Sequence, residues 1–455
     1  MKTNKNGGIT LVALIVTIII LLILAGISIS ALTQTGLFSR AKQAEQISKE
    51  KQEEENEILK KYEELYNSTF STDTEEEIDP NPGELETNKD NPNEYTINSI
   101  EDLVFFSYDV RNGNTYEGKT VKLGQNLDFN SSKSYVDSHR TDYEKYGYSG
   151  ELKDALEKGG FEPIGVYEYE YETWDFKNCF SGTFDGNGKT IYNLNIIKTT
   201  KEEKNTAIGL FAINKGTIKN LKIYNANIMV TDESIPYIGI GIVAGMTSEN
   251  SIINNCSVSG KAEVIQTNGG YNIGGITGAN NGECKNCFNY ANIYGKTSYT
   301  STNESRIGGV VGANENAGTM QNVFNAGNVY ISGIDNQSVK GYYICGIVGK
   351  NKGRITTGYN IGKVTINSEK GNILTNEIAY NVSDSSITAN CYYLKDTLIN
   401  NTSNNITKQQ NGIEKTENEM KTDDFVKLLN TENQNIWKKD TENINNGYPI
   451  ISIKD

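Results

Sequence analysis

The sequence IGGITGANNGECKNCFNYANI, from Ile273 to Ile293, is one copy of a motif that recurs through the chain. The other copies begin at Ile208, Gly241, Ile307, Ile344 and, in a more divergent form, Ile378. Aligned on the dipeptide that is Asn286-Cys287 in this copy, the motif recurs every 31 to 36 residues. A period of this size indicates a repeat architecture, because one copy alone cannot bury its apolar face.

Each copy consists of short apolar runs broken by glycine and asparagine, and no copy holds a segment suited to an amphipathic helix. Such runs predict β-strands. The turn Asn280-Asn281-Gly282 suits the left-handed backbone that a tight corner demands. We therefore expect an all-β fold in which residues 208–394 form a right-handed parallel β-helix, or a closely related β-solenoid, with small helical caps.

Stacked copies would place equivalent residues about 4.8 Å apart, so recurring residues should form ladders along the solenoid. One predicted ladder consists of asparagines: Asn220, Asn255, Asn286, Asn322 and Asn390. A second is aromatic: Phe288, Phe324, Tyr359 and Tyr392. A third is small and apolar and is expected to face the core: Leu221, Cys256, Cys287, Val323 and Cys391.

Residues Gly274–Asn280 followed by Asn286-Cys287-Phe288 resemble the GLUG repeat, a motif common in large surface and secreted proteins of bacteria. Phe180–Gly188 is similar to the segment that usually precedes such repeats, and Asn445–Ile450 is similar to their usual end. The resemblance implies a location on the outer face of a bacterium. It implies no particular enzymatic activity.

The overall composition narrows the class of partner. The chain has 455 residues and a formal net charge of −14, so we expect neither nucleic acid nor an anionic membrane surface to bind it. Six cysteines in a chain of this length do not indicate a disulfide framework. The repeat favours one elongated domain over several compact ones.

The N-terminal residues predict a membrane anchor. Residues 1–8 form a polar leader with two lysines, and Ile9–Leu32 are 24 residues without a charge. That run is long enough to cross a bilayer of about 30 Å as a transmembrane helix. The lysines favour a cytoplasmic N-terminus and an extracellular bulk. Residues 33–67 are rich in good helix formers and predict a helical stalk.

Three interpretations of this segment remain open: a secretory signal peptide cleaved after Ser30, an uncleaved signal anchor, or a processed anchor. The processed anchor is suggested by Gly8-Ile9-Thr10-Leu11, which resembles the processing site of type IV prepilins. The resemblance implies that a prepilin peptidase cuts after Gly8 and methylates Ile9. Ala13 stands where family members usually carry glutamate, which argues against ordinary filament assembly but not against processing.

The remaining segments flank the repeats. Residues 68–93 hold eight acidic residues, one base and three prolines, which predicts an extended, disordered linker. Residues 94–207 should form an N-terminal cap and the first coils, with a helix over Ile100–Val110, capped by Ser99, that plugs the apolar end. Residues 395–455 should close the far end as a C-terminal cap.

No predicted residue set supports catalysis, a metal or a cofactor. Cys284 and Cys287 have CxxC spacing without a second pair, so buried thiols are the favoured interpretation. A disulfide between Cys256 and Cys287 is compatible with adjacent coils. The acidic residues of the repeats lie at non-equivalent positions and form no carboxylate pair: Asp232, Glu263, Glu283 and Asp335.

Three classes of function follow. The favoured hypothesis is a non-enzymatic, membrane-tethered surface protein whose solenoid binds an extracellular glycan or protein in adhesion. The alternatives are a minor pilin or pseudopilin of a pilus or secretion machine, and a polysaccharide-acting β-helix enzyme. Because recurring residues have structural roles, specificity should reside in segments that do not repeat: Asn130–Gly160, Tyr294–Arg306 and Ser332–Tyr343.

Overall fold

The structure, a computed structural model, describes residues 85–129, 161–166, 177–198, 207–232, 237–267, 270–296, 304–332, 341–367, 372–400, 406–430 and 435–452. All of them belong to the compact unit Pro80–Asp455. The predicted leader, transmembrane helix and stalk lie outside the described residues, as does the whole insertion Asn130–Gly160. Within the described ranges, no helix has the length and apolar character needed to cross a membrane.

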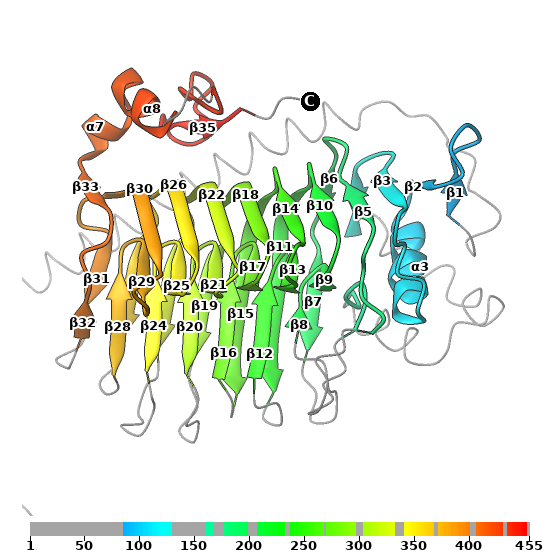
Figure 1. The fold of residues 1–455 in the computed structure, drawn as a ribbon, viewed down its shortest axis with the longest axis horizontal. Coiled ribbons are helices and arrows are strands. Elements are labelled where there is room, and N and C mark those ends of the chain that lie inside the picture. The colour runs from blue at the N-terminus through cyan, green and yellow to red at the C-terminus, as the bar shows by residue number, and fades with distance from the viewer. Residues whose placement is uncertain are drawn as a thin grey trace, which may run out of the picture. The chain divides into compact units, whose positions relative to one another are not determined.

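The described residues form a parallel β-solenoid, which confirms that part of the predicted fold, while the right-handed coil stays a prediction (Figure 1). Each coil crosses a seven-stranded sheet and then a six-stranded sheet. The strands of the seven-stranded sheet are β8 Ala207–Ile208, β12 Tyr237–Gly241, β16 Gly270–Gly274, β20 Ser305–Gly308, β24 Tyr342–Cys345, β28 Ile373–Asn376 and β32 Ile406–Lys408. Those of the six-stranded sheet are β9 Phe211–Asn214, β13 Ala244–Thr247, β17 Thr277–Asn280, β21 Val311–Asn314, β25 Val348–Asn351 and β29 Ala379–Asn381.

Each coil then continues into a twenty-stranded sheet, to which it contributes two successive strand positions. We call these two positions the first step and the second step. The first step contains β3 Thr120–Leu123, β5 Thr183–Asp185, β10 Thr217–Lys219, β14 Ile252–Asn254, β18 Glu283–Asn289, β22 Thr319–Asn325, β26 Arg354–Asn360, β30 Ile387–Leu394 and β33 Ile413–Lys415. The second contains β4 Leu127–Asp128, β6 Thr190–Tyr192, β7 Asn195–Lys198, β11 Lys222–Asp232, β15 Ser257–Thr267, β19 Asn292–Lys296, β23 Val329–Ser332, β27 Val364–Asn367 and β31 Leu398–Asn400.

The parallel register stacks like residues, as predicted. Phe288 lies opposite Phe324, and their rings stack with centroids 4.8 Å apart. Phe324 and Tyr359 repeat the contact at 4.9 Å, and Tyr392 continues the ladder in the next coil. The five members of the predicted core ladder are all buried, and a glycine takes that position in one coil: Leu221, Cys256, Cys287, Val323, Gly358 and Cys391.

The predicted asparagine ladder is present, and it marks the backbone corner within each coil. Its members all have φ between 52° and 59°, the left-handed region that asparagine tolerates better than most residues. The amide of Asn255 donates to Oδ1 of Asn220 at 2.8 Å, and that of Asn322 donates to Asn286 at 3.1 Å. Thr357 takes the same backbone conformation in the one copy that lacks the asparagine.

The predicted left-handed backbone at the Asn-x-Gly turns is wrong, because no residue of Asn280–Gly282 has a positive φ. The asparagine side chain points inward instead, and its amide donates to the carbonyl of Gly282 at 3.1 Å. Glycine is required at position 282 because a Cβ there would lie 2.3 Å from the carbonyl oxygen of Ser251 in the adjacent coil.

These inward asparagines form a second amide ladder that the sequence analysis missed. Asn280, Asn314 and Asn351 are fully buried. The amide of Asn280 donates to Asn314 at 2.9 Å, Asn314 donates to Asn351 at 2.9 Å, and Asn351 donates to Asn381 at 2.8 Å. Each side chain therefore provides a hydrogen-bond partner for the next within a region that excludes water.

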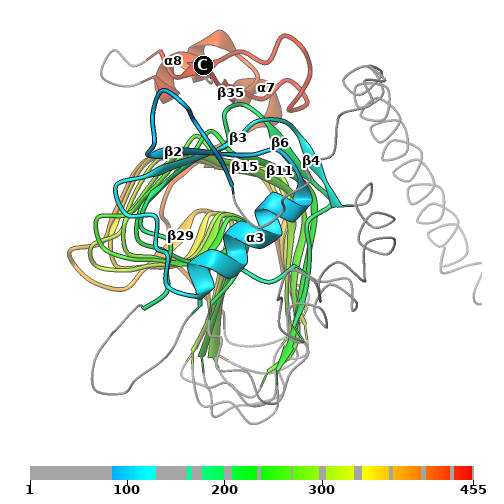
Figure 2. The same ribbon diagram turned by 90° about the vertical axis from the view of Figure 1, so that its right-hand side faces the viewer.

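The N-terminal end of the solenoid is covered as predicted, but the folded region starts earlier than expected. Helix α3, Ile100–Arg111, begins with a capping box between Ser99 and Asp102 and lies across the end of the coil (Figure 2). Phe106 packs against Phe180 and Phe184 of the first coils. The predicted linker 68–93 extends too far, because Leu85 is buried and β1, Glu86–Thr87, pairs with β2, Glu94–Ile97.

Within the predicted C-terminal cap 395–455, β31, β32 and β33 add the last strands at the far end of the solenoid, but the segment after them covers the flank instead of the end. It comprises α7 Glu417–Met420, α8 Asp423–Leu429, β34 Trp437–Lys438 and β35 Ile450–Ile451. Trp437 packs 5.5 Å from the ring of Tyr359 and donates from Nε1 to Asn322 at 3.2 Å. This segment buries the outward aromatic ladder, which would otherwise be a large apolar patch on the surface.

Candidate functional site

The predicted site residues fall into two groups. Gly8 and Ile9, the predicted processing site, lie outside the described residues. Cys256 and Cys287 lie side by side in the core as free thiols, with Cys284 next to Cys287. Burial raises the pKa of both Cys256 and Cys287, which keeps them protonated and unreactive. The predicted disulfide between them is not formed in this structure.

The predicted acidic residues that the structure places do not form a carboxylate pair. Glu263 and Glu283 each form an ion pair on their own strand, with Lys261 and Lys285. Asp335 lies outside the described residues. The Asp185 carboxylate forms an ion pair with Lys219 and accepts hydrogen bonds from the side-chain amide of Asn220 and from the backbone N–H of Asn187. These contacts stabilise the turn that follows Asp185.

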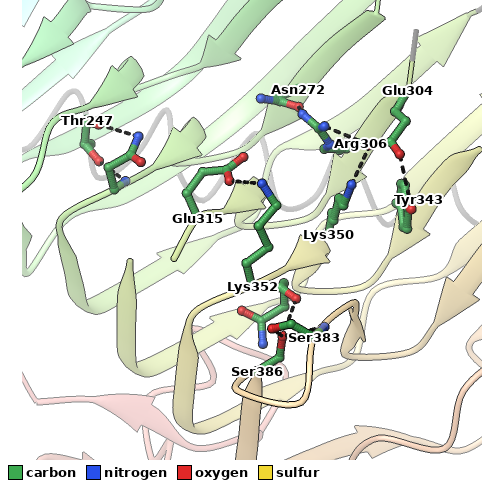
Figure 3. A network of polar contacts seen from close by, with 12 residues as sticks. Thr247, Asn272, Glu304, Arg306, Glu315, Tyr343, Lys350, Lys352, Ser383 and Ser386 are labelled. Atoms are coloured by element: carbon green, nitrogen blue, oxygen red, sulfur yellow. Dashed lines mark hydrogen bonds and ion pairs between the residues drawn. The ribbon is translucent and has the colours of Figure 1, made fainter. Parts of the chain in front are cut away.

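A charged network lies where β20 and β24 of the seven-stranded sheet meet β25 of the six-stranded sheet (Figure 3). We define it as Asn272, Glu304, Arg306, Tyr343 and Lys350. Glu304 Oε2 accepts from Arg306 Nη2 at 2.8 Å and from Lys350 Nζ at 2.5 Å. Arg306 Nη1 donates to Asn272 Oδ1 at 3.1 Å, and Lys350 Nζ lies 4.7 Å from the centroid of the Tyr343 ring.

The repeat itself assembles this network, because its members occupy equivalent positions in successive coils. Asn272, Arg306 and Tyr343 stack in register along the seven-stranded sheet. Lys350 stacks on Ala313 in the six-stranded sheet. In earlier coils the position equivalent to Lys350 in the six-stranded sheet holds the apolar residues Ile213, Met246 and Ala279, which pack together in a small cluster.

Burial and an uneven charge balance perturb the ionisation of the network. The side chains of Arg306 and Lys350 are only 12% and 11% exposed. Burial would raise the pKa of Glu304, but hydrogen bonds from Lys350 and Arg306 outweigh it and hold that pKa below its ordinary value. Burial lowers the pKa of Lys350 although Glu304 opposes the shift, and the neighbouring cations Arg306 and Lys352 add to it.

The network adjoins two of the segments in which sequence analysis placed specificity. Arg306 ends the range Tyr294–Arg306, Tyr343 ends the range Ser332–Tyr343, and the fold brings these two ends together. Lys350 was missed, because it lies within a repeat copy. The sequence did contain a signal for it: Lys350 occupies a position at which the preceding copies have a small or apolar residue.

The same register aligns the points at which the non-repeating connections enter and leave the coils. Each connection leaves a strand of the second step and enters the next strand of the seven-stranded sheet. Because these strands are parallel and paired, their ends lie along one edge of the solenoid (Figure 1). The connections themselves, 233–236, 268–269, 297–303, 333–340 and 368–371, lie outside the described residues and differ in length and sequence.

Comparison with known proteins gives limited matches. No family model matches the chain. A stretch of 124 residues is 32% identical to halomucin of Haloquadratum walsbyi, and it covers 27% of this chain but only 1% of halomucin. The crystal structure of a candidate immunoglobulin A1 protease from Bacteroides ovatus superposes with a TM-score of 0.49 and 17% identity. That alignment covers 81% of this chain and 94% of the other.

Proposed function

We propose that this chain is a non-enzymatic, membrane-tethered bacterial surface protein that displays the β-solenoid for adhesion or ligand binding. The observation that carries the proposal is the alignment of the connection points along one edge of the solenoid. Rigid scaffolds that present variable loops side by side are well suited to binding extended ligands. The resemblance to GLUG repeats supports a surface location.

The hydrogen-bonded scaffold supports this role physically. Buried amide ladders and stacked aromatic rings hold successive coils in register. A binding site assembled from several coils then loses little conformational entropy on binding, because the scaffold is already ordered. Residues that recur serve the fold, so the connections are free to vary with the ligand.

The prepilin-like interpretation of the anchor predicts a processed N-terminus. In a host that expresses a prepilin peptidase, mass spectrometry of the mature chain should find methylated Ile9 at the N-terminus. A Gly8→Val variant should keep the leader, because this peptidase cuts after glycine. An intact Met1 on the wild-type chain in such a host would exclude prepilin-type processing. It would leave the uncleaved anchor as the interpretation of Ile9–Leu32.

Adhesion should depend on the connections. Cells that display the full chain are compared with cells displaying a variant whose residues 297–303 and 333–340 are replaced by Gly-Ser linkers of equal length. We expect adhesion to a matrix of extracellular glycans and proteins to fall at least about tenfold, because loops on rigid scaffolds carry binding. Surface amount, measured by antibody, should stay the same.

The matched control replaces the connection 368–371 in the same way, and adhesion should change less than about twofold, since this short connection presents few side chains. Equal adhesion of the wild type and the two-connection variant would contradict the proposal. Release of reducing sugar ends from the matrix by the wild type would also contradict it, because that result indicates a glycan-cleaving enzyme.

A further inference from the structure

We propose that a patch on the outer face of the second step binds a neutral glycan chain. The patch consists of Asn292 and Tyr294 of β19, Tyr330 of β23, and Asn328, which directly precedes β23. We call these four residues the tyrosine–asparagine patch. β19 and β23 lead into the connections 297–303 and 333–340, so the patch is continuous with the proposed binding edge. The inference rests on the proposed function and names its ligand class.

The parallel register assembles the patch on the surface. Tyr294 lies opposite Tyr330 in the next coil, and their ring centroids are 6.1 Å apart. Each asparagine lies two residues before a tyrosine, so it projects from the same face of the sheet. Asn328 is exposed and the other three side chains are partly exposed. A ligand therefore reaches all four from solvent and needs no cavity.

The backbone fixes the asparagine side chains and leaves their amide groups available. Oδ1 of Asn292 accepts from the backbone N–H of Asn328 at 3.0 Å, and Oδ1 of Asn328 accepts from that of Lys363 at 3.1 Å. In the described part of the chain, neither Nδ2 group has a hydrogen-bond partner. The oxygens are thus committed to the solenoid, whereas the amide donors remain for a ligand.

A sugar chain matches both parts of the patch. Tyrosine rings offer apolar faces at a low cost in conformational entropy, and the C–H groups of a pyranose ring pack on such faces. Sugar hydroxyl oxygens accept hydrogen bonds from amide N–H groups. A peptide strand would instead need the free backbone groups of a sheet edge. β19 and β23 do not offer these groups, because each pairs with a strand on both sides.

The orientation of the two rings narrows the kind of glycan. Successive coils lie about 4.8 Å apart, close to the length of one sugar unit, so a chain running along the solenoid would place one unit on each coil. The planes of the Tyr294 and Tyr330 rings are inclined at 59°. The rings therefore suit a chain whose successive units are turned relative to each other, such as a β-1,3-glucan. The flat ribbon of a β-1,4-glucan fits them less well.

The charges around the patch favour a neutral ligand. On the preceding coil, Lys261 and Glu263 occupy the positions opposite the patch, and they form an ion pair with each other at 3.2 Å. The formal net charge of −14 repels polyanions at long range. The exposed Lys296 and Lys363 flank the patch, so an acidic sugar chain is a necessary comparison in the test.

The test is isothermal titration calorimetry on the full-length chain in micelles of a detergent without a sugar headgroup. The ligand is laminarihexaose, a linear β-1,3-glucan, and the comparison ligands are cellohexaose and hexagalacturonate. We expect the wild type to bind laminarihexaose and to bind each comparison ligand at least about fivefold more weakly. Its affinity should change less than about twofold with salt concentration, because no ion pair forms.

Three substitutions locate the site. Tyr330→Ala removes a ring and should weaken laminarihexaose binding at least about tenfold. Tyr330→Phe keeps the ring and should change binding less than about threefold. Asn328→Asp keeps the oxygen that accepts from Lys363 but removes the amide donor, so binding should weaken about fivefold while the fold keeps its hydrogen bond.

Tyr224→Ala is the matched control for Tyr330→Ala. Tyr192 and Tyr224 form a similar, partly exposed pair, with ring centroids 5.8 Å apart and planes inclined at 62°. The asparagine amides beside this pair are used within the solenoid: Asn225 donates to Asn193, and Asn193 donates to Asp128, both at 2.7 Å. Tyr224→Ala should therefore change laminarihexaose binding less than about twofold.

Equal effects of Tyr330→Ala and Tyr224→Ala, or unchanged binding by Asn328→Asp, would overturn the assignment. So would binding of cellohexaose or hexagalacturonate as tight as that of laminarihexaose. If adhesion still depends on the connections while laminarihexaose does not bind, this inference fails and the proposed function stands. If the displayed wild-type chain does not adhere at all, the proposed function fails.

Discussion

Replacing Gly312 by alanine is expected to destabilise the solenoid by about 3 kcal/mol or more. A Cβ on this residue would lie 2.5 Å from the backbone nitrogen of Ile273 and 2.6 Å from the carbonyl oxygen of Gly278. Both atoms belong to backbone that is fixed in sheets, so no side chain can rotate away to relieve the overlap. The two sheets must separate, and the loss should appear as a lower midpoint in urea unfolding.

The effect belongs to a whole column of glycines. Gly245, Gly278 and Gly349 make the same contact, each with the backbone nitrogen of an isoleucine in the seven-stranded sheet: Ile208, Ile240 and Ile307. These glycines allow the six- and seven-stranded sheets to pack backbone against backbone. The close approach in turn brings Lys350 over Tyr343, so the candidate site depends on it.

Gly118→Ala is the matched control for Gly312→Ala. No atom lies within 4 Å of a Cβ at Gly118, and its φ of +73° limits the cost to backbone strain of about 1–2 kcal/mol. The contrast therefore separates crowding from conformational strain. If Gly312→Ala costs no more than Gly118→Ala, crowding against the backbone of Ile273 and Gly278 does not destabilise the variant.

Replacing Asn314 by leucine is expected to cost about 3 kcal/mol or more, although leucine has a similar shape and is more hydrophobic. Asn314 is fully buried, donates to Asn351 at 2.9 Å and to the carbonyl of Gly318 at 3.1 Å, and accepts from Asn280 at 2.9 Å. Leucine would leave several of these partners buried without a hydrogen bond, and each costs about 1–3 kcal/mol. Chemical denaturation monitored by circular dichroism measures the loss.

An exposed asparagine provides the comparison for this second prediction. Asn328 is exposed, and its Oδ1 accepts one hydrogen bond from the backbone of Lys363. Asn328→Leu should change the free energy of unfolding by no more than about 1 kcal/mol, because water can replace the lost contact. Similar losses for Asn314→Leu and Asn328→Leu would show that the inward amide ladder does not stabilise the fold.

Periodicity made the ladders predictable. A residue that recurs at the same place in every copy must stack on its equivalent in the next coil, whatever the detailed path of the chain. Phe288, Phe324 and Tyr359 were therefore identified as a ladder without knowledge of which way they point. The helix plug was also predictable, since its capping box is encoded by residues within one turn, Ser99 and Asp102.

Backbone conformation was harder to assign, because asparagine fits several environments. Asparagine recurs at several places in the copies, among them those of Asn280, Asn286 and Asn289, and of these three only Asn286 has a left-handed backbone. Asn286 takes positive φ, whereas Asn280 turns inward to satisfy buried carbonyl and amide groups. The local sequence cannot separate the two, because the difference lies in what the neighbouring coil presents.

The sequence by itself determined the parallel solenoid, its three predicted ladders and its N-terminal plug, because these depend on period and on local capping. Tertiary structure alone decided what lies outside the coil. It placed Trp437 on the flank against Tyr359, and it brought Lys350 of β25 to Glu304, which directly precedes β20. Both contacts join residues far apart in sequence, and neither Trp437 nor Lys350 recurs in the other copies of the motif. The contact of Lys350 with Glu304 also depends on how closely glycines such as Gly312 let the six- and seven-stranded sheets approach.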